Sequence, residues 1–133
     1  MLEKINNFIT DAGVLFLATN DGNQPKLRPL GAHILKEDKL YFFVGDFKDV
    51  YKQMKANPLV EIVAFKNDDK TWIRYTGKAV FEQDDSLAKQ VISERPNLQK
   101  TYNEETGYKL MLFHLEDAKA VIYKVGNVIE TVL

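Results

Sequence analysis

Hydrophobic and polar residues alternate along this chain with two different periods, and the helical period comes first. Leu2, Ile5, Phe8 and Ile9 lie at helical spacing, and Gly13 follows them. An apolar stripe that ends at a glycine is typical of a short amphipathic helix. The next part of the chain predicts an antiparallel meander, because apolar runs alternate with polar turn sequences: "VLFLATN", "DGNQ", "PKLRPLGAHILK", "KEDK" and "LYFFVG".

The second half of the chain continues the sheet around two further helical stretches. Val50, Tyr51 and Met54 share one helical face, which ends before the dipeptide "NP". Two strands, "LVEIVAF" and "TWIRYTGKAVF", follow around the turn "KNDDK", and Gly77 predicts a bulge in the second of them. The segment "DDSLAKQVISERP" predicts a helix with an acidic cap and a stop at Pro96. Two or three strands in "YKLMLFHLEDAKAVIYKVGNVIETVL" complete the chain.

These elements favour a fold that is mainly β with short helices. Six or seven strands with two helices between hairpins lack the regular alternation of strand and helix that builds a parallel sheet, so we expect a small closed or split barrel. Tyr41, Phe42 and Phe43 are consecutive in one predicted strand. Because successive side chains point to opposite faces, at least one of these aromatic rings must face away from the barrel core.

The composition is that of one soluble domain over residues 1–133. The chain is 45% hydrophobic, and no apolar run is long enough to span a membrane. Because it has no cysteine and its N-terminus lacks the pattern of a secretory signal, we expect a cytoplasmic location. The formal charge of −1 gives no basic surplus for nonspecific phosphate-backbone binding, so we predict no nucleic acid and no membrane partner.

The common catalytic motifs are missing from the sequence. His33 and His114 are the only histidines, and neither lies in a metal-binding pattern, so no metal site is predicted. Phosphate-binding glycine loops and the hydrolase motif GxSxG are also missing, and a borrowed cofactor would have to supply the chemistry. Arg28, Lys48 and Gln53 are candidates to hold an anionic cofactor, because two cations would meet at a helix N-terminus. The alternative is a solvated Lys48 and an Arg28 paired with an acid.

Three stretches in the right order carry a resemblance to a known family. They are "LATNDGNQPKLRPLG", "LYFFVGDFKDVYKQMKANPLVEIVAF" and "WIRYTGKAVF". Together they resemble the pyridoxamine 5'-phosphate oxidase-like, FMN-binding split-barrel family, and the resemblance extends over nearly the whole chain. It implies a homodimer of six-stranded antiparallel split barrels, with FMN bound in clefts between the two subunits.

The resemblance implies cofactor contacts along the returning arm of the first hairpin. Arg28 matches the arginine that contacts the FMN phosphate, and Pro29 and Leu30 continue the strand that lines the cofactor. This would explain a proline and two cations, Lys26 and Arg28, at one strand end, because that end would face a wet cleft holding a phosphate. His33 falls where the family's oxidases have a lysine, so it is either a cofactor contact or a strand histidine with a structural hydrogen bond.

The other implied contacts lie on the elements that follow. Phe43 and Val44 match the strand end beside the flavin. Lys48 resembles the second phosphate-binding cation, although its spacing from Gln53 is two residues longer than in the oxidases. Gln53 matches a helix glutamine near the site, or is only a surface residue of that helix. Trp72 falls where a side chain of the partner subunit touches the flavin, and ordinary cross-strand packing is its alternative role.

The function implied by the resemblance is that of an FMN-dependent oxidoreductase, in which NADH or NADPH reduces the flavin and an unknown acceptor takes the electrons. Oxidases of pyridoxamine phosphate grip the substrate with a C-terminal arginine and histidine segment, whereas this chain ends in "VGNVIETVL", so that activity is not expected. A non-catalytic flavin carrier or redox sensor is the main alternative, and haem or deazaflavin binding on the same scaffold stays open. A barrel that stacks single-stranded nucleic acid on aromatic residues is disfavoured by the charge balance.

Overall fold

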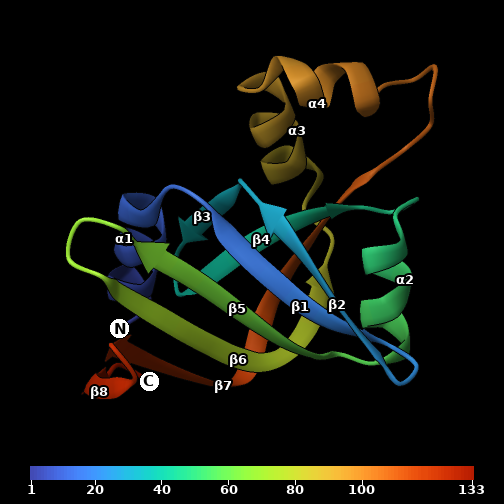
Figure 1. Cartoon of the computed structure of the whole chain (residues 1–133). Helices are drawn as coiled ribbons and strands as arrows, with labels where there is room; N and C mark the ends of the chain where they lie inside the picture. The colour runs from blue at the N-terminus through green and yellow to red at the C-terminus, as the bar shows by residue number, and fades with distance from the viewer.

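An antiparallel sheet of eight strands makes up most of the computed structural model, which describes residues 1–133 (Figure 1). Four helices accompany the sheet, and none of them is long and apolar enough to cross a lipid bilayer. In chain order the elements are α1 (Leu2–Ala12), β1 (Leu15–Asp21), β2 (Gln24–Leu30), β3 (His33–Lys36), β4 (Lys39–Gly45), α2 (Asp49–Ala56), β5 (Leu59–Lys66), β6 (Thr71–Glu82), α3 (Asp85–Ser93), α4 (Pro96–Thr101), β7 (Leu110–Lys124) and β8 (Asn127–Thr131). The predicted class, mainly β with short helices, is confirmed.

The sheet is open, and its strand order is β2-β1-β5-β6-β7-β4-β3, with β8 paired to β7. The predicted number of six strands is therefore wrong. The arm "PKLRPLGAHILK" breaks at Gly31 and Ala32 into β2, which pairs with β1, and β3, which pairs with β4. One continuous strand could not serve both partners, because β1 and β4 lie near opposite ends of the sheet. The C-terminal segment adds a hairpin of β7 and β8.

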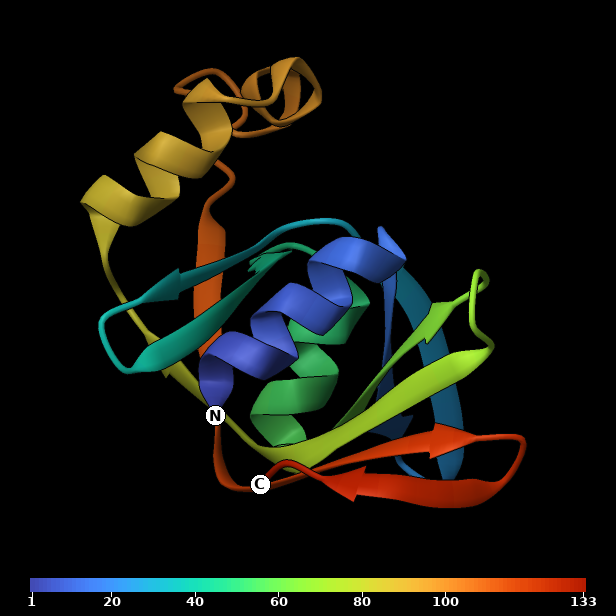
Figure 2. The same ribbon diagram turned by 90° about the vertical axis from the view of Figure 1, so that its left-hand side faces the viewer.

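The main core lies inside the curve of the sheet. Phe42, Tyr75 and Phe113 are its largest fully buried side chains, and the ring centroids of Phe42 and Phe113 are 5.6 Å apart. Figures 1 and 2 show α1 at one end of the curled sheet and α2 at the other. Helix α1 buries Ile5 and Ile9 in this core, on the apolar face that the sequence predicts. The two helices thus close the ends that a short barrel would leave open to water.

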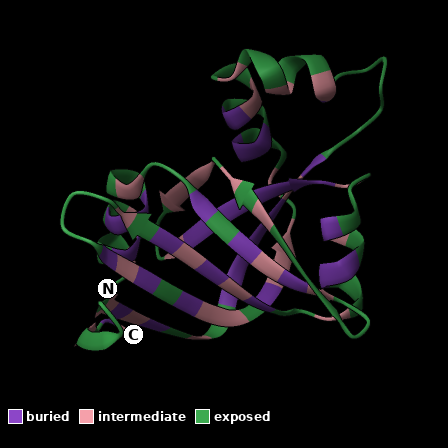
Figure 3. Cartoon of the chain, viewed as in Figure 1, coloured by how far each residue is buried: buried purple, intermediate pink, exposed green.

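Strand β4 is buried on both faces. In strands β1, β5 and β6, by contrast, buried residues alternate with more exposed ones, as the colours of Figure 3 show. Phe42 points into the main core, whereas Tyr41 and Phe43 point to the other face and join a second apolar cluster with Leu87 and Val91 of α3. The prediction that an aromatic side chain of "LYFFVG" faces away from the barrel core is confirmed. The aromatic side chains on this outer face are covered by helix α3 of the same chain.

The helices α3 and α4 form a small lobe on the outside of the sheet (Figures 1 and 2). Asp84 caps α3 by accepting a hydrogen bond from the Leu87 N–H at 3.0 Å, as the acidic cap in the sequence predicts. The helix ends at Ser93, but Pro96 is the first residue of α4, so the expected stop at Pro96 is also a start. Proline is favoured at this position because its missing N–H is one that a helix start leaves unpaired.

Strand β6 shows the alternation and the bulge that its sequence predicts. Ile73 and Tyr75 are buried, whereas Arg74 between them is exposed. The pairing of β6 with β7 shifts register at Gly77, where an added Cβ atom would lie 2.9 Å from the Glu116 carbonyl oxygen. The close approach of the two backbones explains the glycine at this bulge.

Candidate functional site

The edge strand β2 directs Arg28 toward the interior of the sheet. Arg28 pairs in register with the fully buried Leu17 of β1, so both side chains lie on the inner face. Pro29, the next residue, lies on the opposite face and is tolerated because β2 has a neighbouring strand on one side only. A half-buried guanidinium therefore sits where the sheet ends and α2 begins to cover it.

The guanidinium of Arg28 is held by three neutral acceptors. Its Nη1 atom donates to the Leu17 carbonyl oxygen at 3.1 Å and to Thr19 Oγ1 at 2.7 Å. Its Nη2 atom donates to Gln53 Oε1 of α2 at 3.0 Å. Since three of the five guanidinium N–H groups are used in this way, the Nε–H and one Nη2–H have no acceptor in the chain.

No carboxylate neutralises this arginine. Arg28 takes part in none of the ion pairs of the structure, which contradicts the alternative of an Arg28 paired with an acid. Partial burial lowers the pKa of Arg28 from its ordinary value, because removal from water disfavours the charged form. An arginine remains charged nevertheless. The charge of Arg28 is thus available to an anion from outside the protein.

The start of α2 adds further anion-binding groups. Lys48 is the N-cap residue of this helix, and its exposed ammonium group forms no ion pair within the chain. Asp49 and Val50 are the first two residues of α2, and the backbone N–H groups in the first turn of a helix have no acceptor within that helix. Free N–H groups and the positive end of the helix dipole make such a turn favourable for a phosphate.

A cavity of about 410 Å³ joins these groups to an apolar wall. Its volume lies within the range of small-molecule sites. Six residues predicted from the sequence line it: Arg28, Pro29, Leu30, Phe43, Val44 and Lys48. The structure therefore brings most of the predicted cofactor residues to one place, and they include both cations and apolar side chains.

No pattern in the sequence indicated the part of this cavity that the α3–α4 lobe supplies. Arg95, the N-cap residue of α4, adds a third cation, and no acidic residue lines the cavity. Tyr102 places its hydroxyl group against Gly45, where no larger residue would fit. The one signal for Arg95 is its place directly before Pro96, a residue that the sequence indicates only as a helix stop. The further lining residues are Gly31, Ala32, Gly45, Val50, Leu98, Tyr102 and Leu110.

Gln53 and His33 lie outside the cavity lining, for different reasons. Gln53 is buried behind the cavity and contacts Arg28, so it is not a surface residue of α2. His33 places Nδ1 2.7 Å from Asn6 Oδ1 of α1 and packs its ring against Phe42. Burial, and then the charge of Arg95, lower the pKa of His33, which favours the neutral imidazole. These contacts favour the structural role for His33.

Trp72 lies on the outer face of β6, away from the cavity of its own chain. Its indole stacks on Tyr123 with ring centroids 4.5 Å apart, and the Arg74 guanidinium lies 5.2 Å from the indole centroid. The indole is half-buried and belongs to neither apolar cluster. Cross-strand packing with Tyr123 is therefore present, and a contact with a cofactor held by a second subunit stays a prediction.

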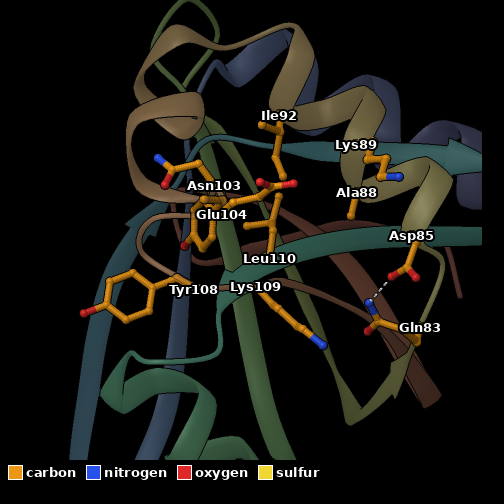
Figure 4. Close-up of a pocket in the computed structure, with 12 residues that line it drawn as sticks. Gln83, Asp85, Ala88, Lys89, Ile92, Asn103, Glu104, Tyr108, Lys109 and Leu110 are labelled. Atoms are coloured by element: carbon orange, nitrogen blue, oxygen red, sulfur yellow. Dashed lines mark hydrogen bonds between the residues drawn. The ribbon is translucent and has the colours of Figure 1, made fainter.

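A second cavity of about 380 Å³ lies between α3 and the segment that leads into β7 (Figure 4). It shares Tyr102 and Leu110 with the first cavity, and none of the residues predicted from the sequence lines it. Two acids and two bases line it, since Asp85 and Lys89 come from α3, and Glu104 and Lys109 come from the connecting segment. The balanced charges give this cavity no preference for an anion, in contrast to the cavity with three cations.

Comparisons with known proteins agree with this fold. A family model described as pyridoxamine 5'-phosphate oxidase matches residues 1–121. A NimC/NimA family protein from Clostridium acetobutylicum is 31% identical, with a TM-score of 0.82 over 97% of this chain and 90% of that chain. A FAD-binding protein from Mesorhizobium loti is 18% identical, with a TM-score of 0.61 over 90% of this chain and 93% of that chain. HutZ, the heme storage protein from Vibrio cholerae, is 14% identical, with a TM-score of 0.62 over 87% of this chain and 91% of that chain. A search of curated proteins finds no significant match.

Proposed function

Because the chain belongs to the pyridoxamine 5'-phosphate oxidase family, we propose that its cationic cavity binds FMN and that the protein is an FMN-dependent oxidoreductase. The observation that carries this proposal is the guanidinium of Arg28, which is fixed by three hydrogen bonds and paired with no carboxylate. A cation held in this way inside a cavity fits a phosphate-bearing ligand.

The residues of the cavity match the two ends of FMN. The phosphate would lie near Arg28, Lys48 and the first N–H groups of α2, which supply donors and positive charge. The flavin ring would lie against the apolar part of the wall, where Phe43 and Leu110 are found. A flavin-binding role also agrees with the FAD-binding protein of Mesorhizobium loti, which shares the fold.

The protein would contribute binding and orientation, and the cofactor would contribute the redox chemistry. FMN, when bound, would supply the hydride and electron chemistry between NADH or NADPH and a further acceptor. No lining side chain forms a paired acid and base, so the chain would act by holding the ring and by controlling access to it. Arg95 at the cavity wall would attract an anionic group of the second reactant. The cytoplasmic location and the lack of activity on pyridoxamine phosphate stay predictions.

Haem is a second candidate ligand, because HutZ shares the fold. The cavity favours flavin, since no histidine, cysteine or methionine lines it and these side chains are common ligands of haem iron. Tyr102 is the one lining residue of a type that ligates haem iron, and its hydroxyl group lies against Gly45. We therefore propose FMN as the ligand and treat haem as an outcome that the following experiment would detect.

The absorption spectrum of the purified protein tests this proposal directly. We expect the visible bands of an oxidised flavin, or their appearance in bound form when FMN is added to apoprotein. The bands of haem or of a deazaflavin would contradict the proposal. Stopped-flow mixing with NADH and NADPH then separates an oxidoreductase from a carrier or sensor, because only the former reduces and reoxidises its flavin over repeated cycles.

We also propose that the protein is a homodimer with FMN between the subunits. The aromatic residues of "LYFFVG" need no second copy, because α3 of the same chain covers them. The outer face of the sheet is different, since Phe16, Leu27 and Phe65 are exposed there. We expect an interface above roughly 2,000 Å² of total buried area. Sedimentation velocity at micromolar concentration measures the mass, and a 15.3 kDa monomer that binds FMN would contradict the dimer.

Trp72→Ala tests the expected contact between the indole and the flavin of the partner subunit. We expect FMN binding to weaken by about 0.5 to 1.5 kcal/mol, the range of an aromatic pair, and FMN to quench the tryptophan emission of the wild-type protein. The apoprotein should lose little stability, because Trp72 lies outside both apolar clusters. Fluorescence titration and denaturation of the same variant measure the two effects. A large loss of apoprotein stability with unchanged FMN affinity would show that Trp72 only packs within its own sheet.

A further inference from the structure

Three side chains behind the proposed phosphate site form a closed ring of hydrogen bonds. Arg28 donates to Thr19 Oγ1 at 2.7 Å and to Gln53 Oε1 at 3.0 Å. Thr19 in turn donates to Gln53 Oε1 at 2.6 Å. These directions are fixed, because a guanidinium can only donate and an amide oxygen can only accept. Thr19 is 2% exposed and Gln53 is 9% exposed, so the ring is a buried, specific arrangement.

The ring holds a cation without any negative charge. Buried charges are ordinarily paired with an opposite charge, and a glutamate would fill the same volume as Gln53 and accept the same hydrogen bond. Asp21 and Asp49 line the small cavity next to Gln53, yet neither forms an ion pair with Arg28. The neutral residue at position 53 therefore keeps the full charge of Arg28 directed at the cavity.

We propose that Gln53, together with Thr19, is a positioning residue that makes the site selective for a ligand carrying a phosphate. It orients the guanidinium so that the Nε–H and one Nη2–H remain free, and it leaves the charge of Arg28 without a competing anion. This inference rests on the proposed binding of FMN and adds the group that sets its selectivity. Riboflavin, which is FMN without the phosphate, is the matched probe for the selectivity.

The inference predicts effects of opposite sign in Gln53→Glu. The new carboxylate would supply a charged hydrogen-bond partner to the Arg28 guanidinium, which is already partly removed from water and has no acid partner, so the apoprotein should unfold at a higher denaturant concentration than the wild type. The same carboxylate would repel the phosphate and compete for the guanidinium, so FMN binding should weaken by at least about tenfold. Riboflavin binding should change by less than about twofold, since riboflavin has no phosphate. A residue with a merely structural role would not weaken binding while it stabilises the fold.

Two further variants complete the experiment. Gln53→Met removes the acceptor without adding charge, and we expect an FMN affinity between those of wild type and Gln53→Glu, with a less stable apoprotein. Lys55→Gln lowers the net charge by the same amount as Gln53→Glu from an exposed position in the last turn of α2, and it should leave FMN affinity unchanged. Isothermal titration with FMN and with riboflavin gives the affinities, and urea denaturation gives the stabilities.

The outcomes separate this inference from the proposed function. If wild-type protein binds FMN but Gln53→Glu binds it equally well, or loses FMN and riboflavin to the same extent, the positioning role is wrong and the proposed function stands. If Gln53→Glu does not fold, the inference requires Gln53→Met to weaken FMN binding and spare riboflavin binding, and equal losses overturn it. If wild-type protein binds no FMN, the proposed function fails and the inference fails with it.

Discussion

Replacing Arg28 with alanine is expected to weaken FMN binding by about 1.5 to 3 kcal/mol, or roughly tenfold to 150-fold. This is the range of a hydrogen bond to a charged group, and the guanidinium keeps two N–H groups and its positive charge available to the phosphate. Titration of apoprotein with FMN measures the loss. The other cations of the cavity, Lys48 and Arg95, would retain part of the affinity.

Two controls make the Arg28 result specific. Lys26→Ala removes an equal charge from the same strand at an exposed position outside the cavity, and its FMN affinity should match that of the wild type. Because Arg28→Ala also removes the donor to Thr19 Oγ1 and leaves Gln53 Oε1 with the Thr19 hydroxyl group as its remaining donor, the affinity must be expressed per folded molecule from a parallel denaturation curve. An unchanged dissociation constant in Arg28→Ala would show that the phosphate binds elsewhere.

Phe42→Ala is expected to lower the free energy of unfolding by about 3 to 5 kcal/mol, the range for a large side chain removed from a packed core. Phe42 is fully buried in the main core, and its ring centroid lies 5.6 Å from that of Phe113 and 6.4 Å from that of Tyr75. Neither neighbour can fill the resulting cavity without leaving its own position. Urea denaturation followed by circular dichroism measures the change.

Phe16→Ala is the matched control for the core variant. Phe16 lies on the outer face of β1 and is 37% exposed, so its truncation should destabilise a single chain much less than that of Phe42. Equal losses in the two variants would mean that the outer face of β1 is as well packed in solution as the core. That result would favour a tightly covered sheet face, as in the proposed dimer, whereas a small loss in Phe42→Ala would contradict the assignment of Phe42 to the centre of the fold.

Local patterns in the sequence predicted most of the secondary structure. The helical spacing in residues 2–12 and the alternation in "TWIRY" depend only on the geometry of one element, so they could be interpreted without knowledge of any partner. The same is true of Gly77, whose place inside an apolar strand predicted the bulge found there. The resemblance to the family placed Arg28, Phe43 and Lys48 in one site, and the structure brings them to one cavity.

The tertiary structure decided which segments pair and what covers them. The arm from Pro25 to Lys36 looks continuous in the sequence, and only the positions of β1 and β4 in the sheet show why it divides at Gly31. Helix α3 already ends at Ser93, and Pro96 begins α4, which depends on the fold of the lobe outside the sheet. Arg95 enters the cavity for the same reason. No pattern among neighbouring residues of the sequence shows which distant segments pair or which side chains enter the cavity.

The ring of Arg28, Thr19 and Gln53 shows this division most clearly. Local periodicity in the sequence is enough to place an arginine on a hairpin strand and a glutamine on a short helix. That these two side chains meet over a separation of 25 residues, and that Arg28 has no carboxylate partner, follows from the folded chain alone. The physical reason is that local periods specify the direction of each side chain within its element, whereas packing between distant elements determines which side chains meet and what charge remains at the site.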